Sequence, residues 1–295
     1  MKAPTDKRND TIQIIVTTTC DRGRCSNCTQ LLPFRRDVRH MSVDVFRRAV
    51  ESVVDWPGVV GLFGGNPCMH PQFSTLCDIM TELIPDQRRR GIWTNDLLGH
   101  GELVRATFFP NGRFNINVHG NSAKAMEVER YVPGKVIPKS RTQSAWHSPV
   151  LMHYDDVGLT YEQWVPLREQ CDINRNWSAA IAERDGEPFA YFCEVAAALD
   201  GVRGVNNGNP VEPGWWKQPI SWFDHQIVMC CDHGCGIPLR QRGHFDNDHV
   251  YDITASWERI LRTSERVAIA MHESLPDKGV AETTDYMRLR KGQKA

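Results

Sequence analysis

The sequence predicts an α/β fold in which a partial parallel barrel of six strands and their helices precedes a small loop-rich domain. Two observations support this prediction. Over the first 185 residues, short β-branched apolar stretches alternate with stretches of helical periodicity, as in successive βα units. After residue 185 this alternation stops, and residues 201–222 are rich in Gly, Asn, Pro and Trp. We therefore expect a (β/α)6 TIM-like partial barrel over residues 1–185 and a second domain over residues 186–295.

Six segments are expected to form the parallel strands, namely residues 11–19, 58–65, 89–96, 113–120, 149–156 and 176–183. Helices are expected over residues 42–56, with Ser42 as the N-cap, and over residues 73–84, where Pro85 ends the helix. A further helix is expected over residues 253–271. In parallel barrels the active site forms at the carboxyl ends of the strands, so the residues that follow each strand are the candidates for function.

The segment 113–120 has an unusual alternation of side chains. Asn115, Asn117 and His119 alternate with Phe114, Ile116 and Val118. Successive side chains of a strand point to opposite faces, so one face of this strand is polar and the other is apolar. The apolar face is expected to contact the helices, and the polar face to line the interior, where a ligand could bind it. An edge strand with one solvated face is the alternative.

The 295 residues carry a formal charge of −1, which disfavours a general binder of long nucleic acid or of membrane surfaces. No stretch is long and apolar enough to span a membrane. The first ten residues contain no apolar segment typical of a secretory signal, so we expect a cytoplasmic protein. Structural disulfides are rare there, and the clustering of the ten cysteines instead indicates metal or cluster ligation.

Three cysteines follow the first expected strand in the arrangement C-x4-C-x2-C, formed by Cys20, Cys25 and Cys28. Three thiolates from one loop can bind three irons of a [4Fe–4S] cluster and leave the fourth iron open for chemistry. Arg22 and Arg24 in the loop would offset the negative charge of such a cluster. Plant-type [2Fe–2S] proteins use a similar spacing, and zinc could bind the same thiols.

The order of these features resembles the radical S-adenosylmethionine superfamily. The second expected strand ends in Gly64-Gly65-Asn66-Pro67, where that family commonly has Gly-Gly-Glu-Pro. The resemblance implies a [4Fe–4S] cluster and S-adenosylmethionine as cofactors. It also implies that Gly64, Gly65, Asn66 and Pro67 contact the methionine part of S-adenosylmethionine and that Asn95 and Asn117 contact its adenosine part. Two departures are the loop, which is one residue longer than the common C-x3-C-x2-C, and Asn66, which lacks the charge of glutamate.

The resemblance also implies a mechanism. A reduced cluster would cleave S-adenosylmethionine, and the resulting 5′-deoxyadenosyl radical would abstract hydrogen from a substrate such as a peptide, sugar or nucleoside. The outcome would be an oxidation, an epimerisation or a rearrangement, which makes the chain an enzyme of the oxidoreductase or isomerase type. A flavodoxin-like or ferredoxin-like protein would act as the external electron donor.

A second group of cysteines lies in the C-terminal part. Cys193 stands apart, and Cys230, Cys231 and Cys235 are close together. Four thiolates can ligate a [4Fe–4S] cluster completely, and the pattern resembles the SPASM or twitch extensions that carry auxiliary clusters in the same superfamily. Because adjacent cysteines are awkward ligands for one metal, we expect one of Cys230 and Cys231 to be a spectator, with His233 as the candidate fourth ligand. A zinc site and unligated buried thiols are the alternatives.

Four further residues are candidates for catalysis. His119, His153 and Asp155 lie near expected strand ends, where they could bind substrate or transfer protons. Cys68 follows the glycine pair and could donate hydrogen in an epimerisation; Cys171 is a similar candidate. For each of these residues a structural role is the alternative. For the chain as a whole, the alternatives are a non-catalytic electron-transfer protein with two clusters and a binding module stapled by zinc.

Overall fold

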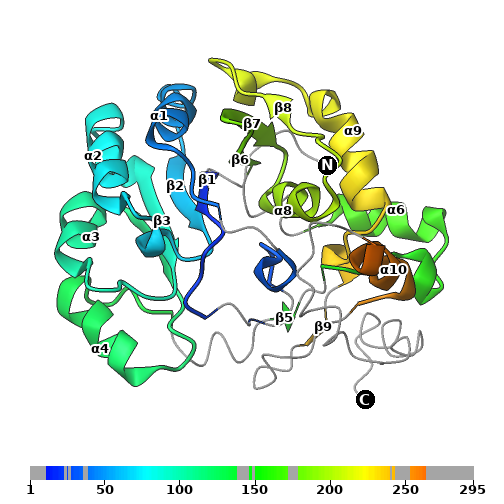
Figure 1. Ribbon diagram of the computed structural model, residues 1–295, viewed down its shortest axis with the longest axis horizontal. Coiled ribbons are helices and arrows are strands. Elements are labelled where there is room, and N and C mark those ends of the chain that lie inside the picture. The colour runs from blue at the N-terminus through cyan, green and yellow to red at the C-terminus, as the bar shows by residue number, and fades with distance from the viewer. Residues whose placement is uncertain are drawn as a thin grey trace.

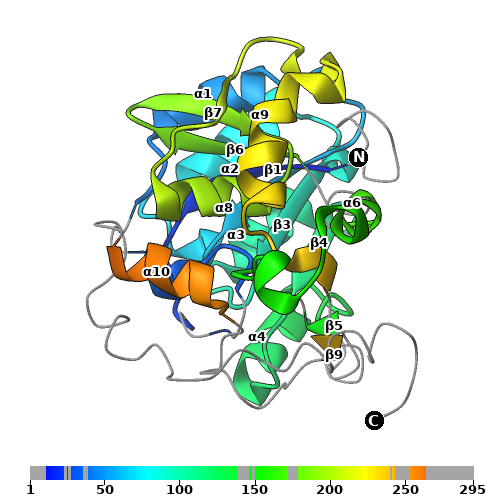
Figure 2. The same cartoon turned by 90° about the vertical axis from the view of Figure 1, so that its right-hand side faces the viewer.

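A seven-stranded mixed sheet is the centre of the computed structural model, and helices pack against it (Figure 1). The structure describes residues 11–22, 25, 28–35, 39–137, 146–147, 150–171, 179–239, 241–242 and 253–263. Within these residues the strands of the sheet are β1 (Thr11–Thr17), β2 (Val59–Gly64), β3 (Arg90–Thr94), β4 (Arg113–Ile116), β6 (Ala179–Arg184), β7 (Glu187–Tyr191) and β8 (Asn209–Pro210). Two short strands, β5 (Trp146–His147) and β9 (Gln241–Arg242), pair apart from it, at one end of the molecule below α6 (Tyr161–Glu169) (Figure 2).

The strand order is β4-β3-β2-β1-β6-β7-β8. The first five of these strands are parallel, and β7 and β8 run antiparallel to their neighbours. Every residue of β1 and β2 is buried, as expected for strands covered on both faces. Because β1 to β4 are parallel neighbours, the segments that follow them meet at one edge of the sheet. This edge carries the candidate site.

The helices around the sheet are α1 (Val43–Glu51), α2 (Phe73–Leu83), α3 (Gly101–Phe108), α4 (Ser122–Tyr131), α8 (Glu194–Arg203), α9 (Asp224–Gln226) and α10 (Ala255–Thr263). In Figure 1, α1 to α4 form one row along the left side, while α8, α9 and α10 lie on the right. The predicted N-cap is present, because the Ser42 hydroxyl accepts a hydrogen bond from the Val45 amide at 3.3 Å. The helix ends at Glu51 rather than at Trp56. Trp56 instead packs edge-on against Trp216, with ring centroids 5.2 Å apart.

The sheet differs from the prediction in its fifth strand. In the segment 149–156, the described residues 150–156 add no strand to the seven-stranded sheet; Leu151 forms isolated bridges to Cys235 and Ile253. The Leu151 backbone therefore pairs with two later segments of the chain. The next described strand, β6, pairs directly with β1, so β1 lies in the middle of the sheet, and among the described residues five strands, not six, are parallel. The curvature of a partial barrel stays a prediction.

The expected domain boundary at 185/186 falls in the tight turn of the β6–β7 hairpin. The sheet is therefore continuous across it, and β7 and β8 extend the sheet that β1 to β4 begin. The helix predicted over 253–271 is described as α10 up to Thr263, and its remainder lies outside the described residues. None of the described helices is long and apolar enough to cross a membrane.

We expect His70 to make the unfolding free energy of the apo-protein depend on pH. Its Nε2 donates to the Met41 carbonyl at 2.8 Å, and its Nδ1 accepts from the Gln72 amide at 3.1 Å. Burial, with a smaller effect of His40, lowers the pKa of His70 despite the bond to Met41. Protonation of His70 would turn its Nδ1 from an acceptor into a donor and break the bond from the Gln72 amide, which lowers the free energy of unfolding by about 1 kcal/mol.

The folded pKa of His70 is depressed, so the unfolded chain takes up the proton first as the pH falls. This contribution to stability is present above the unfolded pKa near 6.5 and is lost below it. Between pH 7.5 and pH 5.5, the free energy of unfolding measured with urea should fall less for His70→Gln than for wild type. Equal losses in the two proteins would contradict this prediction.

Candidate functional site

A cavity of about 280 Å³ opens at the carboxyl edge of β1 to β4. The segments after all four strands contribute to its lining, which includes Cys20, Cys25, Cys28, Gly64, Gly65, Asn95, Asn117 and His119. The strand order therefore brings together residues that are almost one hundred positions apart in the sequence. Sequence analysis predicted the three cysteines, the glycine pair and these polar residues as parts of one site, and the structure gathers them around one cavity.

The three cysteine side chains each have a distinct environment. The Sγ of Cys20 lies 3.7 Å from Oδ1 of Asn95, and the Sγ of Cys25 lies 3.8 Å from Nε2 of His119. Burial raises the pKa of the Cys28 thiol and raises that of Cys25 to about 12, although the guanidinium of Arg22 opposes the shift at Cys25. Despite this guanidinium, the two thiols stay protonated at neutral pH in the absence of a bound metal. Arg24 lies outside the described residues.

The glycine pair is required by a close approach of two backbone segments. A Cβ at Gly65 would lie 2.0 Å from the Thr19 carbonyl oxygen, and one at Gly64 would lie 2.2 Å from that of Thr17. Gly64 also has φ +133°, which side chains other than glycine rarely adopt. The Gly65 amide donates to the Thr17 carbonyl at 2.8 Å, and the Asn66 amide donates to the Thr19 carbonyl at 2.7 Å. The pair thus anchors the start of the cysteine loop.

We expect Gly65→Ala to lower the free energy of unfolding by about 3 kcal/mol, because the new methyl group would push the Thr19 backbone away. Urea unfolding of the apo-protein measures this effect. Gly134→Ala is the control, since Gly134 has φ +71° and nothing within 4 Å of a built Cβ, so only the backbone cost of about 1 kcal/mol applies. Equal losses in the two variants would show that the contact with Thr19 is unimportant.

Asn66 does not line the cavity, and its side chain is completely buried. Its Oδ1 accepts from the Cys68 amide at 3.0 Å and from the Thr94 hydroxyl at 2.7 Å. Its Nδ2 donates to Asp21 at 3.2 Å and to the Asp96 carbonyl at 3.1 Å. All of its usual hydrogen-bonding positions are therefore used inside the protein. The contact with the methionine part of S-adenosylmethionine that sequence analysis expected of Asn66 would need one of these bonds to break.

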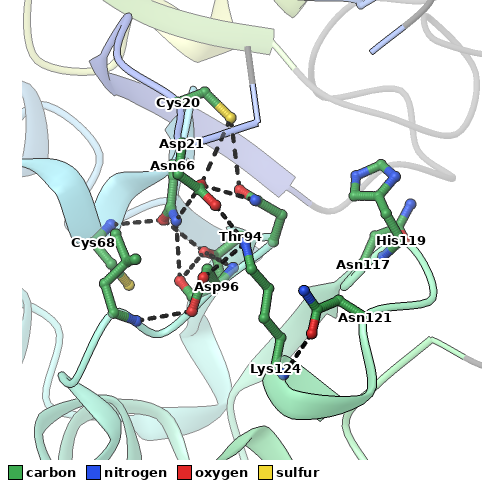
Figure 3. Close-up of polar contacts among 12 residues, drawn as sticks. Cys20, Asp21, Asn66, Cys68, Thr94, Asp96, Asn117, His119, Asn121 and Lys124 are labelled. Carbon is green, nitrogen blue, oxygen red and sulfur yellow. Dashed lines mark hydrogen bonds and ion pairs between the residues drawn. The ribbon is translucent and has the colours of Figure 1, made fainter. Parts of the chain in front are cut away.

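A charged network beside Asn66 was not predicted from the sequence (Figure 3). Lys124 from α4 forms ion pairs with Asp21 and with Asp96, the latter at 2.7 Å. Burial alone would raise the pKa of Asp21, but hydrogen bonds from Lys124, Asn95 and Asn66 outweigh it and hold that pKa below its ordinary value. The carboxylate of Asp21 is therefore ionised at neutral pH.

The polar face of the segment 113–120 lies along the cavity. Asn115, Asn117 and His119 all contribute to its lining, whereas Ile116 and Val118 are buried in the core. Only Arg113–Ile116 forms strand β4. The chain then turns, with the His119 amide donating to Oδ1 of Asn117 at 3.0 Å. His119 has φ 51° at this turn.

Four other predicted residues lie away from this cavity. Pro67 and Cys68 are buried in a short 3₁₀ turn after β2, where burial raises the pKa of the Cys68 thiol. The amide of His153 donates to the Thr254 hydroxyl at 3.1 Å, and its ring stacks on that of Tyr154. Asp155 is exposed beside it. His153 and Asp155 therefore lie beside the C-terminal segments, whereas Pro67 and Cys68 lie behind the cavity, where the Cys68 amide donates to Asn66.

The C-terminal cysteines are close neighbours of a fifth cysteine, Cys171. Burial first, and then the neighbouring thiols, raise the pKa values of Cys193, Cys231 and Cys235, and both Cys171 and Cys230 are among the neighbours of all three. Cys171 follows the end of α6, and sequence analysis did not include it in this group. No spacing rule connects it to the later cysteines, so only the fold reveals the proximity.

Cys230 differs from its neighbour Cys231. Its Sγ lies 3.5 Å from Nδ2 of Asn207 and 3.9 Å from the carbonyl oxygen of Ala196. Burial raises its pKa to about 12, and the next largest effects come from Asn207, Asp200 and Arg203 rather than from other thiols. The two adjacent thiols therefore differ in their contacts, although Cys230 also raises the pKa of Cys231. His233, the alternative ligand, is exposed and stacks against His153 with ring centroids 6.4 Å apart.

The segment that bears these cysteines is anchored through Asp232. Residues Ile227–Asp232 form a π-helical turn that continues α9. The Asp232 carboxylate accepts from Arg168 at 2.7 and 2.8 Å and from Nε1 of Trp164 at 3.3 Å. Arg168 and Trp164 belong to α6, which leads to Cys171. This buried ion pair thus holds Cys171 and the later cysteines against each other.

Comparisons with known proteins find similar solved structures. No family model and no curated protein matches the sequence. BtrN in complex with AdoMet and 2-DOIA is 19% identical with a TM-score of 0.47, over 78% of this chain and 89% of BtrN. BtrN in an open conformation is 17% identical with a TM-score of 0.39, over the same shares. SuiB of Streptococcus suis bound to S-adenosylmethionine is 17% identical with a TM-score of 0.32, over 55% of this chain but only 38% of SuiB.

Proposed function

We propose that this chain is a radical S-adenosylmethionine enzyme. Cys20, Cys25 and Cys28 would hold a [4Fe–4S] cluster, and S-adenosylmethionine would bind beside it in the cavity. The observation that carries the proposal is the arrangement of the cavity itself. Three cysteines from one loop line it together with Gly64 and Gly65 and with polar groups that follow β3 and β4.

The residues of the cavity fit a cluster better than a single metal ion. A zinc ion needs its sulfur ligands to converge at about 2.3 Å from one point. The three thiols line an open cavity of about 280 Å³ together with polar groups from other segments, whereas a structural zinc site is closed by four protein ligands. Buried thiols that resist ionisation need a cation to exist as thiolates, which the irons of a cluster would supply.

When both are bound, the cluster and S-adenosylmethionine supply a 5′-deoxyadenosyl radical, which abstracts hydrogen from a C–H bond of the substrate. The protein's own residues bind and orient these cofactors and exclude water from the cavity. Asn95 contacts Cys20 and donates to Asp21 at 2.8 Å, so its side chain fixes the loop on the β3 side. Asn117 and His119, which follow β4, supply further hydrogen-bonding groups in the lining of the cavity, where they would contact the adenosine part or the substrate.

A second [4Fe–4S] cluster is proposed for the C-terminal part, with Cys171, Cys193, Cys231 and Cys235 as ligands. Cys171 and Cys230 both raise the pKa values of Cys193, Cys231 and Cys235, so all five thiols are neighbours. The contacts of the Cys230 thiol with Asn207 and Ala196 favour Cys230 as the one that is not a ligand. A fully ligated cluster has no open iron for substrate, so its role would be electron transfer. This favours an oxidation, which would make the enzyme an oxidoreductase served by a flavodoxin-like or ferredoxin-like partner in the cytoplasm.

The test is anaerobic reconstitution of the purified chain with iron and sulfide, followed by dithionite and S-adenosylmethionine. Release of 5′-deoxyadenosine, with about eight irons bound, is the expected result for two clusters. Zinc in place of iron would favour the binding module. Iron without any cleavage of S-adenosylmethionine would favour the electron-transfer protein.

A further inference from the structure

Asp21 directly follows Cys20, and three side chains from three other segments hold its carboxylate (Figure 3). Its Oδ1 accepts from Nδ2 of Asn95 at 2.8 Å and from Nδ2 of Asn66 at 3.2 Å. Its Oδ2 forms an ion pair with Nζ of Lys124. Because its partners follow β2 and β3 or lie on α4, this one side chain ties the cysteine loop to the rest of the site.

The other charges of the network strengthen this anchor. Lys124 reaches from the first turn of α4, whose N-cap Asn121 accepts from the Lys124 amide at 3.1 Å. Its ammonium group also pairs with Asp96 at 2.7 Å. The side chains of Asp21 and Lys124 are only 20% and 23% exposed, so their ion pair is less screened than a surface pair.

The side-chain amide at position 66 is a hydrogen-bond donor to the carboxylate at position 21. Nδ2 of Asn66 donates to Asp21, and Oδ1 of Asn66 is already used by Thr94 and Cys68. A carboxylate at position 66 would place a second negative charge in contact with Asp21 inside a buried network, which is strongly unfavourable. An acid at position 21 therefore requires a donor at position 66.

We propose that Asp21 is the positioning residue of the cysteine loop, and that position 66 is an amide because it must donate to this carboxylate. Asp21 would act through Cys20, holding its thiolate toward the cavity, and would touch neither S-adenosylmethionine nor substrate. The proposal rests on the proposed function only in that the loop is taken to bind an iron–sulfur cluster.

The first test compares Asp21→Asn with wild type after reconstitution. Losing one charge-assisted anchor should make an iron chelator extract the iron of the first cluster on the order of tenfold faster. It should also change the electron paramagnetic resonance spectrum of the reduced protein. Glu82→Gln is the matched control, since it removes one carboxylate from the ion pair with Arg47 at 2.9 Å, on the outer helices α1 and α2. Equal release rates and unchanged spectra in both variants would overturn the proposal.

The second test is a double-mutant cycle between positions 21 and 66. Asn66→Asp should release iron faster than Asp21→Asn, and Asp21→Asn/Asn66→Asp should release it more slowly than Asn66→Asp alone. If the effects of the two substitutions on the rate of iron release are additive, the two residues do not act on each other and the proposal is wrong. If Asp21→Asn does not fold, Lys124→Met removes the same ion pair and should act in the same direction. Wild type that binds no iron would instead refute the proposed function.

Discussion

Replacing Cys20, Cys25 and Cys28 together by alanine is expected to abolish the cleavage of S-adenosylmethionine, with at least a thousandfold loss of 5′-deoxyadenosine. Activation of S-adenosylmethionine requires an iron that the protein leaves open, and in this proposal only the three-cysteine loop leaves one open. The variant should also lose about four irons per chain. Chromatographic assay of 5′-deoxyadenosine and iron analysis of the same sample measure both effects.

The control for this variant is Cys77→Ala. Cys77 lies in α2 with its thiol buried in the hydrophobic core, and it does not line the cavity. Its replacement should retain iron and cleavage while lowering the unfolding temperature by a few degrees. If the triple variant still cleaves S-adenosylmethionine, the open iron must be held elsewhere and the assignment of the N-terminal loop is wrong.

The features that sequence analysis predicted well are those encoded over short distances. The β-branched run of β1, the N-cap Ser42 and the glycine pair each express a local requirement of the backbone. Parallel strands also explain why Cys20, Gly65, Asn95 and Asn117 could be assigned to one site before the fold was known. Their positions after successive strands place them at the same edge of the sheet.

The features that sequence analysis missed depend on contacts between distant segments. Asp21 and Lys124 are about one hundred positions apart, and nothing in either segment indicates an ion pair. The interpretation of Asn66 as a ligand contact considered position 66 alone, whereas its partners come from the cysteine loop and from the segment after β3. Similarly, the apolar run after residue 149 has the composition of a strand, but its pairing partners are Cys235 and Ile253.

The two groups of cysteines differ in how their geometry is encoded. Cys20, Cys25 and Cys28 belong to one loop, so their spacing alone limits which metal groups they can hold. The C-terminal set combines residues from the end of α6, the start of α8 and the turn after α9. Asp232, which lies in this turn and binds Trp164 and Arg168 of α6, fixes the position of the turn relative to α6. A mutation at the contact between Asp232 and α6 would thus disturb the second group of cysteines and leave the first group unchanged.

Cys171→Ala is expected to remove the second cluster, whereas Cys230→Ala is expected to retain it. Both changes are best made in the Cys20→Ala/Cys25→Ala/Cys28→Ala background, where all remaining iron belongs to the C-terminal part. About four irons should remain in that background and after Cys230→Ala, and few after Cys171→Ala. Both Cys171 and Cys230 neighbour Cys193, Cys231 and Cys235, but the Cys230 thiol already contacts Asn207 and Ala196, which favours Cys171 as the fourth ligand.

This pair of variants also separates ligation from packing. Cys171 is partly buried and Cys230 is almost fully buried, so loss of packing alone would make Cys230→Ala the more damaging change. Iron content and unfolding temperature should therefore rank the two variants in opposite orders. If Cys230→Ala loses the iron and Cys171→Ala keeps it, Cys230 is the ligand and the proximity of Cys171 has no part in binding. Zinc in place of iron in this background would keep the ligand set but make the second site structural.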